Sequence, residues 1–353
     1  MGPLLEVRDL SVRFVTDDGV VRAVDGVSFS VDVGRSLGIV GESGSGKSVS
    51  ALTILGLTRA KNARFSGEVL FEGRDLLALP ADELRSVRGQ EIAMIFQDPL
   101  SSLHPFHRVG DQLVEAIRAH HDVSKEAGRG RAAEMLSMVG IPDARNRLSS
   151  YPHEFSGGMR QRAMIAMALI NGPKLLIADE PTTALDVTVQ AQILELIQKL
   201  QQETGTAVIM ITHDLGVVAE ITHDIAVMYA GRVVERAPTD ELFGAPQHPY
   251  TWGLLRSIPR LDSPRDEELV PIEGRPPSLI NRPSGCAFHP RCPYVREAHK
   301  RIDPELQPVD GSPGHEVACL LAQPVRAELW RRLDAGEAPE RARAAVPLGE
   351  AAE

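Results

Sequence analysis

LGIVGESGSGKS, residues 37–48, joins a short apolar run to a glycine-rich turn that ends in lysine and serine. Residues 41–48 match the pattern G-x-x-x-x-G-K-[ST], in which backbone N–H groups turn inward and surround phosphate groups. The apolar run before the turn and the amphipathic segment that begins near Lys47 predict a strand, a loop and a helix in that order. We therefore predict a nucleotide-binding P-loop at one end of a parallel sheet.

The residues of this loop have different expected roles. Glycines allow the backbone to approach the phosphates, Lys47 reaches the β and γ oxygens, and the Ser48 hydroxyl ligates Mg²⁺. The alternative is a glycine-rich turn without a ligand, and the preceding strand argues against it. The predicted nucleotide-binding residues of the loop are Gly41, Glu42, Ser43, Gly44, Ser45, Gly46, Lys47 and Ser48.

The hydrophobic pattern divides the rest of the chain into β, helical and mixed segments. Short alternating runs between Leu5 and Val33 predict an antiparallel β region, and apolar spacings of three and four predict a helical subdomain at about 98–171. The continuously apolar runs 174–178 and 207–212 are typical of central parallel strands, with a helix over 187–203 between them. The fold class predicted is α/β, with a doubly wound parallel sheet as its core.

Changes in composition divide the chain into three segments. We expect a nucleotide-binding domain over 1–235 and an irregular extension over 236–325, because residues 244–315 are rich in proline, glycine and histidine. Residues 326–353 are rich in Ala, Arg and Glu, and we expect a fraying helix and a flexible tail there.

The composition also limits the class of protein. A formal net charge of −10 argues against nucleic acid as a partner, because domains that bind it present a basic surface. The sequence has no run near the roughly 18 apolar residues of a membrane helix. Its N-terminus, MGPLLEVRDL, does not have the pattern of a signal peptide. We expect a cytoplasmic chain that reaches a membrane only through a partner.

An acidic pair follows the apolar run LLIA. Asp179 is expected to lie at the strand end opposite the P-loop and to hold Mg²⁺, and Glu180 to accept a proton from an attacking water. An isolated Asp-Glu pair after a strand is more often a helix cap. The P-loop upstream favours the catalytic interpretation.

Residues 156–161, SGGMRQ, resemble the signature motif of ABC transporter ATPases, a family with a RecA-like P-loop NTPase core. The resemblance covers about residues 5–330 and implies that the signature contacts the γ-phosphate held by the P-loop of a second ATPase subunit. A serine hydroxyl and glycine N–H groups at a helix start are a suitable anion site. The residues implied are Ser156, Gly157, Gly158 and Gln161.

Four further positions resemble the same family. Gln97, after IAMIF, matches the Q-loop glutamine that meets Mg²⁺ and the attacking water, and His213, after AVIMIT, matches the switch histidine. Ala184-Leu185-Asp186 resembles the D-loop at the dimer interface, which implicates Asp186. Phe14 is the candidate for stacking on adenine, with plain strand packing as its alternative. Lys47, Gln97, Glu180 and His213 are thus the catalytic set that we predict.

Sequence outside the catalytic core resembles the ATPase subunits of dipeptide and oligopeptide importers. The resemblance is carried by QDPLSSLHP at 97–105, QHPYTWGLL at 247–255 and GCAFHPRCPY at 285–294. It implies a peripheral protein on the cytoplasmic face of the membrane, with a second, identical or different, ATPase subunit. It also implies two transmembrane permeases and an extracytoplasmic substrate-binding protein.

Three other functions compete with this interpretation. Nickel importers share much of the pattern, because the binding protein and the permeases choose the solute. A soluble ABC protein of translation or DNA repair usually has tandem ATPase domains or a coiled-coil insertion, and this chain has one P-loop. A regulatory subunit with an inactive site is disfavoured because Glu180 and His213 are both present.

The C-terminal extension contains all three cysteines of the chain. Members of the importer family usually have four here, and the resemblance implies a [4Fe-4S] cluster ligated by Cys286, Cys292, Cys319 and His299, the last at the fourth cysteine position. A Cys₃His zinc site is the second interpretation, and three inert thiols without metal are the third. His289 and His315 are weaker candidate ligands.

Overall fold

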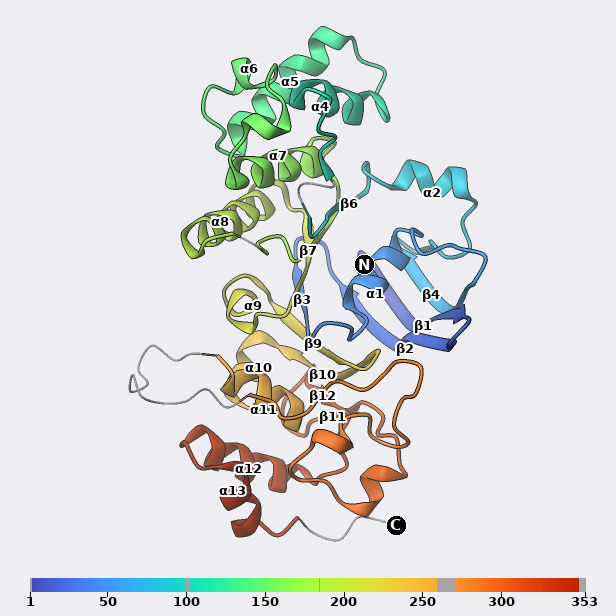
Figure 1. Cartoon of the computed structure of the whole chain (residues 1–353), viewed down its shortest axis with the longest axis vertical. Helices are drawn as coiled ribbons and strands as arrows, with labels where there is room; N and C mark the ends of the chain where they lie inside the picture. The colour runs from blue at the N-terminus through green and yellow to red at the C-terminus, as the bar shows by residue number, and fades with distance from the viewer. Residues whose placement is uncertain (1, 99–101, 184, 259–270, 349–353) are drawn as a thin grey trace.

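A computed structural model describes residues 2–98, 102–183, 185–258 and 271–348 of the chain. It contains a four-stranded sheet in the order β2-β1-β4-β5 and an eight-stranded sheet in the order β11-β12-β10-β9-β3-β8-β7-β6 (Figure 1). Helices pack around the larger sheet, as the predicted α/β fold class requires, and this prediction is confirmed.

The N-terminal β region forms the smaller, antiparallel sheet. Its alternating sequence places one face in a core and leaves the other more exposed, as the burial of Leu5, Val7, Leu10 and Val12 on β1 shows. The strands are β1 (Leu5–Thr16), β2 (Gly19–Val31), β4 (Ala63–Phe71) and β5 (Arg74–Asp75).

The larger sheet has a parallel centre. Every residue of β3, β7 and β8 is buried, five in β3, five in β7 and six in β8. This burial accounts for their largely apolar sequence. The parallel strands are β3 (Ser36–Val40), β6 (Ile92–Ile95), β7 (Leu175–Asp179), β8 (Ala207–Thr212) and β9 (Asp224–Tyr229), followed by antiparallel β10 (Arg232–Pro238). The associated helices are α1 (Lys47–Ile54), α2 (Ala81–Val87), α8 (Val187–Thr204) and α9 (Leu215–Ile221).

A helical layer lies at one end of the molecule, in green at the top of Figure 1. Its helices share a core with the sheet, in which Leu113, Ile117 and Ile165 are fully buried. They are α4 (Val109–Arg118), α5 (Lys125–Met138), α6 (Ala144–Arg147), the 3₁₀ turn Pro152–Glu154 and α7 (Gly157–Leu169).

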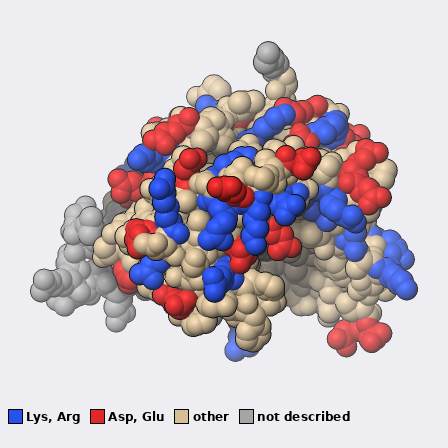
Figure 2. Space-filling model, turned by 90° about the horizontal axis from the view of Figure 1, so that it is seen from above, with Lys and Arg blue, Asp and Glu red and all other residues tan. Residues whose placement is uncertain are grey.

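On the face of the molecule seen in Figure 2, Lys and Arg side chains are intermixed with those of Asp and Glu.

The C-terminal extension adds two short strands to β10 and two helices beside them. Glu235 of β10 is fully buried and accepts hydrogen bonds from the backbone N–H groups of Gln247 and His248 and from the His315 ring. The elements are α10 (Thr239–Gly244), α11 (Pro249–Arg256), 3₁₀ turns at His289–Arg291 and Glu297–Lys300, β11 (Gln307–Pro308) and β12 (Glu316–Val317).

The structure differs from our expectation of a flexible tail over 326–353. Its described part, to residue 348, continues α12 (Gln323–Asp334) and forms α13 (Pro339–Ala345). The reason is a small apolar core in which Leu329, Trp330 and Leu333 are buried and the Trp330 ring stacks on Trp252 at 6.5 Å. Within the described residues, every helix is too short or too polar to cross a lipid bilayer.

Candidate active site

The P-loop connects the end of β3 to the start of α1, and its path requires glycine at two positions. Gly41 has φ +150°, and a Cβ atom on it would lie 2.2 Å from the Met228 carbonyl oxygen. Gly46 has φ +103°, and its Cβ would lie 2.4 Å from the Ala23 carbonyl oxygen. Neither position has room for a side chain. The loop therefore brings its backbone N–H groups close to any bound phosphate.

Lys47 lies under this loop and is 5% exposed. Its Nζ donates hydrogen bonds to the carbonyl oxygens of Gly41, at 2.6 Å, and Glu42, at 3.0 Å. Burial lowers the pKa of Lys47, although the carboxylates of Glu180, Asp179 and Glu42 act in the opposite direction. Two neutral carbonyls are weaker partners for an ammonium than phosphate oxygens, so a bound nucleotide can replace them.

Asp179 ends β7 beside the start of α1. The Ser48 hydroxyl donates to Asp179 Oδ1 at 3.1 Å. Burial raises the pKa of the Asp179 carboxyl group, partly offset by this hydrogen bond. A hydroxyl and a carboxylate oxygen at this distance fit Mg²⁺, which takes oxygen ligands and needs only one or two from the protein when nucleotide phosphates supply others.

Glu180 follows on a strained backbone, with φ +47°. Its Oε2 accepts from Gln97 Nε2 at 2.8 Å and from the Thr183 hydroxyl at 3.0 Å, and its Oε1 lies 3.1 Å from His213 Nδ1. Burial acts to raise the pKa of Glu180, but the hydrogen bonds with His213 and Thr183 outweigh it and the pKa falls below its ordinary value. Glu180 is thus ionised at neutral pH and able to accept a proton.

The structure brings the predicted catalytic residues together from four strand ends, because parallel strands present their carboxyl ends at one edge. Lys47 and Ser48 follow β3, Gln97 follows β6, Asp179 and Glu180 lie at the end of β7, and His213 follows β8.

The residues predicted to form the signature lie elsewhere. Ser156 caps α7, and its hydroxyl accepts from the Met159 backbone N–H at 3.3 Å. Figure 1 shows α7 in the helical layer, away from α1. Gln161 is buried and donates to the Pro181 carbonyl, which connects α7 to the residue after Glu180. Gly157 and Gly158 form the first turn, where the packed Val189 leaves little room for a Cβ on Gly158.

Two other predicted residues have local structural partners. Asp186 caps α8, since its carboxylate accepts a hydrogen bond from the Val189 N–H at 3.0 Å. Ala184 of the predicted D-loop and residues 99–101 of the importer motif lie outside the described residues. Phe14 is half-buried on β1 and packs against the core of the β region.

Three residues in contact with this site were missed by sequence reasoning. Thr183 binds Glu180, Arg291 forms a bidentate ion pair with the Glu42 carboxylate at 2.6 and 3.0 Å, and the Tyr250 hydroxyl accepts from the Glu42 N–H at 2.8 Å. Both Glu42 partners come from the extension, more than 200 residues along the chain. The motif QHPYTWGLL includes Tyr250 and GCAFHPRCPY includes Arg291, so the resemblance contained a signal that we did not use.

The predicted metal ligands of the extension do not form a metal site. Among the described residues, no group of three or more His, Cys, Asp and Glu side chains is placed to hold a metal ion. Burial raises the pKa values of Cys286 and Cys292 and raises that of Cys319 to about 11, which favours protonated thiols. His299 Nδ1 already accepts from the Arg296 N–H at 3.1 Å. The [4Fe-4S] and Cys₃His zinc predictions are not confirmed.

A P-loop, an acidic strand end, a histidine after the next strand and a separate serine-capped helix form the arrangement expected of an ATPase of the ABC class. The family "ABC transporter" matches residues 24–183, and the family "Oligopeptide/dipeptide transporter, C-terminal region" matches residues 234–298.

Curated relatives match nearly the whole chain. It is 53% identical to the oligopeptide transport ATP-binding protein OppD of Bacillus subtilis (strain 168), over 91% of this chain and 89% of the relative. It is 52% identical to the dipeptide transport ATP-binding protein DppD of the same strain, over 93% and 97%. A solved structure, the dimeric post-hydrolysis state of the ATP-binding cassette MJ0796 bound to ADP and Pi, is 28% identical with a TM-score of 0.60, over 67% of this chain and 98% of its own.

The chain therefore belongs to the family of ATP-binding subunits of oligopeptide and dipeptide ABC transporters, and it is an ATPase.

Proposed function

We propose that this chain supplies the ATP-hydrolysing half-sites that drive import of dipeptides or oligopeptides. The arrangement of Glu180 carries the hydrolytic part of the proposal. This carboxylate is ionised, faces Lys47 across the P-loop and is held by three side chains. It is suited to take a proton from water that attacks the γ-phosphoryl group.

The neighbouring residues have complementary roles. Lys47 and the P-loop N–H groups bind the β- and γ-phosphates and stabilise the negative charge that develops on them. Gln97 and His213 hold the Glu180 carboxylate in position, and both can reach a water or a γ-phosphate beside it. Ser48 and Asp179 would hold Mg²⁺, which neutralises phosphate charge when bound.

This constellation is half of a complete site. Ser156, Gly157 and Gly158 open α7 with a capping hydroxyl and the N–H groups of a first helical turn, which suits them to bind an anion. Helix α7 nevertheless lies away from α1, which begins with Lys47 (Figure 1). We infer that they complete the site of a second ATPase subunit, with Asp186 near the shared interface. Loss of the γ-phosphate on hydrolysis then weakens the dimer and converts chemistry into motion.

The transport assignment rests on the extension. Residues 234–298 match the C-terminal region of oligopeptide and dipeptide transporters, and relatives matched over nine-tenths of the chain are named for those substrates. We infer a nucleotide-binding domain over 1–235 with a helical subdomain at about 98–171, and an extension over 236–325. We also infer two permeases, a substrate-binding protein and a peripheral position on the cytoplasmic membrane face.

An uptake experiment tests this function. The chromosomal copy in the native host is replaced by the Glu180→Gln variant, and uptake of a radiolabelled tripeptide and of ⁶³Ni²⁺ is measured side by side. Tripeptide uptake should stop while nickel uptake continues. Glu195→Gln, on the exposed face of α8, is the matched control and should leave both unchanged. Loss of nickel uptake alone would assign the chain to a nickel importer instead.

A further inference from the structure

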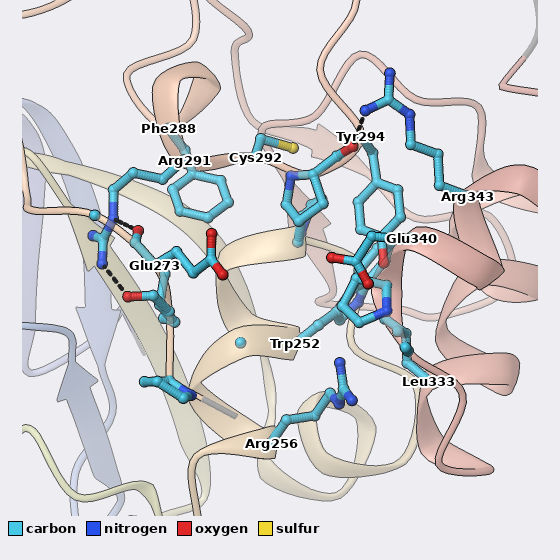
Figure 3. A pocket seen from close by; sticks show the side chains of 18 of the residues that line it. Trp252, Arg256, Glu273, Phe288, Arg291, Cys292, Tyr294, Leu333, Glu340 and Arg343 are labelled. Carbon is cyan, nitrogen blue, oxygen red and sulfur yellow. Dashed lines mark hydrogen bonds between the residues drawn. The ribbon is translucent and has the colours of Figure 1, made fainter. Parts of the chain in front are cut away.

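A cavity of about 940 Å³ lies in the C-terminal part of the molecule, apart from the nucleotide site (Figure 3). Its walls come from α11, from residues 271–274, from residues 288–294 and from the connection between α12 and α13. This volume is at the upper end of the range in which proteins bind small molecules. Nothing in the proposed ATPase mechanism uses the cavity.

The back wall of the cavity is aromatic and contains one unused polar group. Trp252 and Tyr294 pack edge to face, with ring centroids 5.5 Å apart, and both are almost fully buried. The Trp252 Nε1–H donates to the Pro246 carbonyl at 2.8 Å. The Tyr294 hydroxyl is buried and has no hydrogen-bond partner among the described residues. Buried hydroxyls normally have a partner, so a ligand that supplies one would satisfy this group.

The rim carries charges of both signs. Figure 3 shows Arg256, Glu273 and Glu340 directed toward the same open space in front of Trp252. None of these three has an ion-pair partner within the described part of the chain. Arg343 uses one N–H group to bind the Pro293 carbonyl at 2.7 Å. A simple anion or cation would meet like charge at this rim, whereas a molecule with a carboxylate and an ammonium group finds partners for both.

One wall of the cavity is joined to the P-loop by Arg291. This guanidinium donates to the carbonyl oxygens of Glu273, at 2.9 Å, and Ile272, at 3.2 Å, and it forms the bidentate ion pair with Glu42. Its side chain is 5% exposed. On α11, Tyr250 holds the Glu42 N–H while its neighbours Pro249 and Trp252 line the cavity. A movement of either wall would therefore change the contacts of Glu42, the second residue of the P-loop.

We propose that this cavity is a regulatory site for a short peptide with free termini. The peptide ammonium binds Glu273 or Glu340, its carboxylate binds Arg256 and attracts Arg291, and an apolar side chain packs on Trp252 and Tyr294. Because Arg291 then holds Glu42 less firmly, the occupied site lowers the affinity of the P-loop for ATP. This inference goes beyond the proposed function and stands whether the transported solute is a peptide or a metal ion.

Calorimetry on the purified full chain tests the ligand class. The probe is the tripeptide Ala-Phe-Ala, and the comparison probe is the same tripeptide acetylated and amidated at its ends. Ala-Phe-Ala should bind one site per chain, the capped form at least tenfold more weakly, and Arg256→Gln should weaken binding of the free tripeptide about tenfold, as expected for a lost charge-assisted hydrogen bond. Arg341→Gln, exposed on α13 and outside the cavity, should bind like the wild type.

ATP affinity, measured with and without saturating Ala-Phe-Ala, tests the coupling. The tripeptide should weaken ATP binding about fivefold, and ATP should weaken tripeptide binding by the same factor, because coupling between two sites is reciprocal. Arg291→Gln should weaken tripeptide binding less than Arg256→Gln does, and it should remove the mutual effect. Equal binding of free and capped tripeptide, unchanged binding in Arg256→Gln, or an ATP affinity that the tripeptide leaves unchanged or raises would overturn the proposal. ATP hydrolysis by the same preparations, measured alone, reports on the catalytic assignment independently.

Discussion

Glu180 in the nucleotide site and Glu235 beneath the extension each lie among three hydrogen-bonding groups, yet the two environments differ. All three partners of Glu180 are side chains, and one of them, His213, is 59% exposed. Two partners of Glu235 are backbone N–H groups, its third is the buried His315 ring, and its side chain is 0% exposed. The carboxylate of Glu180 is thus held by side chains, one of them exposed, whereas that of Glu235 is held by two backbone groups and a buried ring.

This contrast has an energetic consequence. A carboxylate held by side chains near solvent can exchange its partners for water or substrate at little cost, because each hydrogen bond is replaced. A fully buried carboxylate cannot, since its removal leaves donors without any acceptor. We therefore expect substitution of Glu180 to affect chemistry with little effect on folding, and substitution of Glu235 to do the reverse.

The largest effect is expected for Glu180→Gln. The amide keeps the size of the side chain but cannot accept a proton from water, so kcat for ATP hydrolysis should fall about 10²- to 10⁴-fold. ATP binding and the midpoint of thermal unfolding should remain near wild type, and gel filtration with ATP should detect a dimer. Glu195→Gln is the control for the change of charge. Near-normal turnover would exclude Glu180 as the general base.

Glu235→Ala is the reciprocal substitution. It leaves the N–H groups of Gln247 and His248 and the His315 ring without their acceptor, and we expect a loss of about 3 kcal/mol in the free energy of unfolding. Urea denaturation measures the loss, and limited proteolysis should locate it in residues 236–348. Glu220→Ala, exposed on α9, should change stability by less than about 0.5 kcal/mol. Equal stability of the two variants would contradict the anchoring role of Glu235.

A smaller effect is expected where the two regions meet. Tyr250→Phe removes the acceptor for the Glu42 N–H, so the P-loop should lose about 1 kcal/mol of preorganisation and ATP affinity should fall about fivefold. Tyr294→Phe removes a hydroxyl without a partner among the described residues and should leave ATP affinity unchanged in the absence of peptide. Equilibrium titration with ATP distinguishes the two variants. Similar affinities would show that the extension does not support the P-loop through Tyr250.

The residues predicted for the nucleotide site could be grouped from sequence because they follow apolar strands at fixed positions. Parallel strands bring such residues to one sheet edge whatever the loops between them do, so Lys47, Asp179, Glu180 and His213 could be grouped without a structure. Thr183 and the strained φ of Glu180 had no comparable signal.

The extension could not be predicted in the same way because few of its contacts are periodic. Arg291 and Tyr250 reach Glu42 from irregular or distant segments, and no spacing rule links them. The buried face of α12 includes Leu329, Trp330 and Leu333, a spacing compatible with a packed helix, whereas the Ala, Arg and Glu composition of the same segment predicts a flexible tail. Three cysteines and a histidine suggested a metal site through family resemblance alone, and side-chain geometry does not assemble one.

The smallest expected effect is a dependence of stability on pH. It distinguishes the buried surroundings of Glu235 and His248 in the extension from the more exposed nucleotide site. His248 is 1% exposed, and its Nδ1 accepts from the Tyr250 N–H at 3.0 Å at the start of α11. Burial, with a contribution from nearby Arg326, lowers the pKa of His248 to about 3. An unfolded histidine has a pKa of about 6.5. His248 therefore stabilises the fold fully above that pKa, and the contribution is lost as pH falls toward 3, because only the unfolded chain binds the proton.

Between pH 7 and pH 6 this loss is about 0.7 kcal/mol. His248→Asn keeps a side chain that can cap α11 but cannot titrate, so the difference in unfolding free energy between wild type and variant should shift by that amount in favour of the variant over this interval. Urea denaturation of wild type and variant, in parallel at both pH values, measures this shift. If the difference in unfolding free energy between wild type and His248→Asn is the same at pH 7 and pH 6, the prediction is wrong, because the folded chain then binds the proton as readily as the unfolded chain does. The surroundings of Glu235 and His248 would then be accessible to protons from the solvent, like the more exposed surroundings of Glu180.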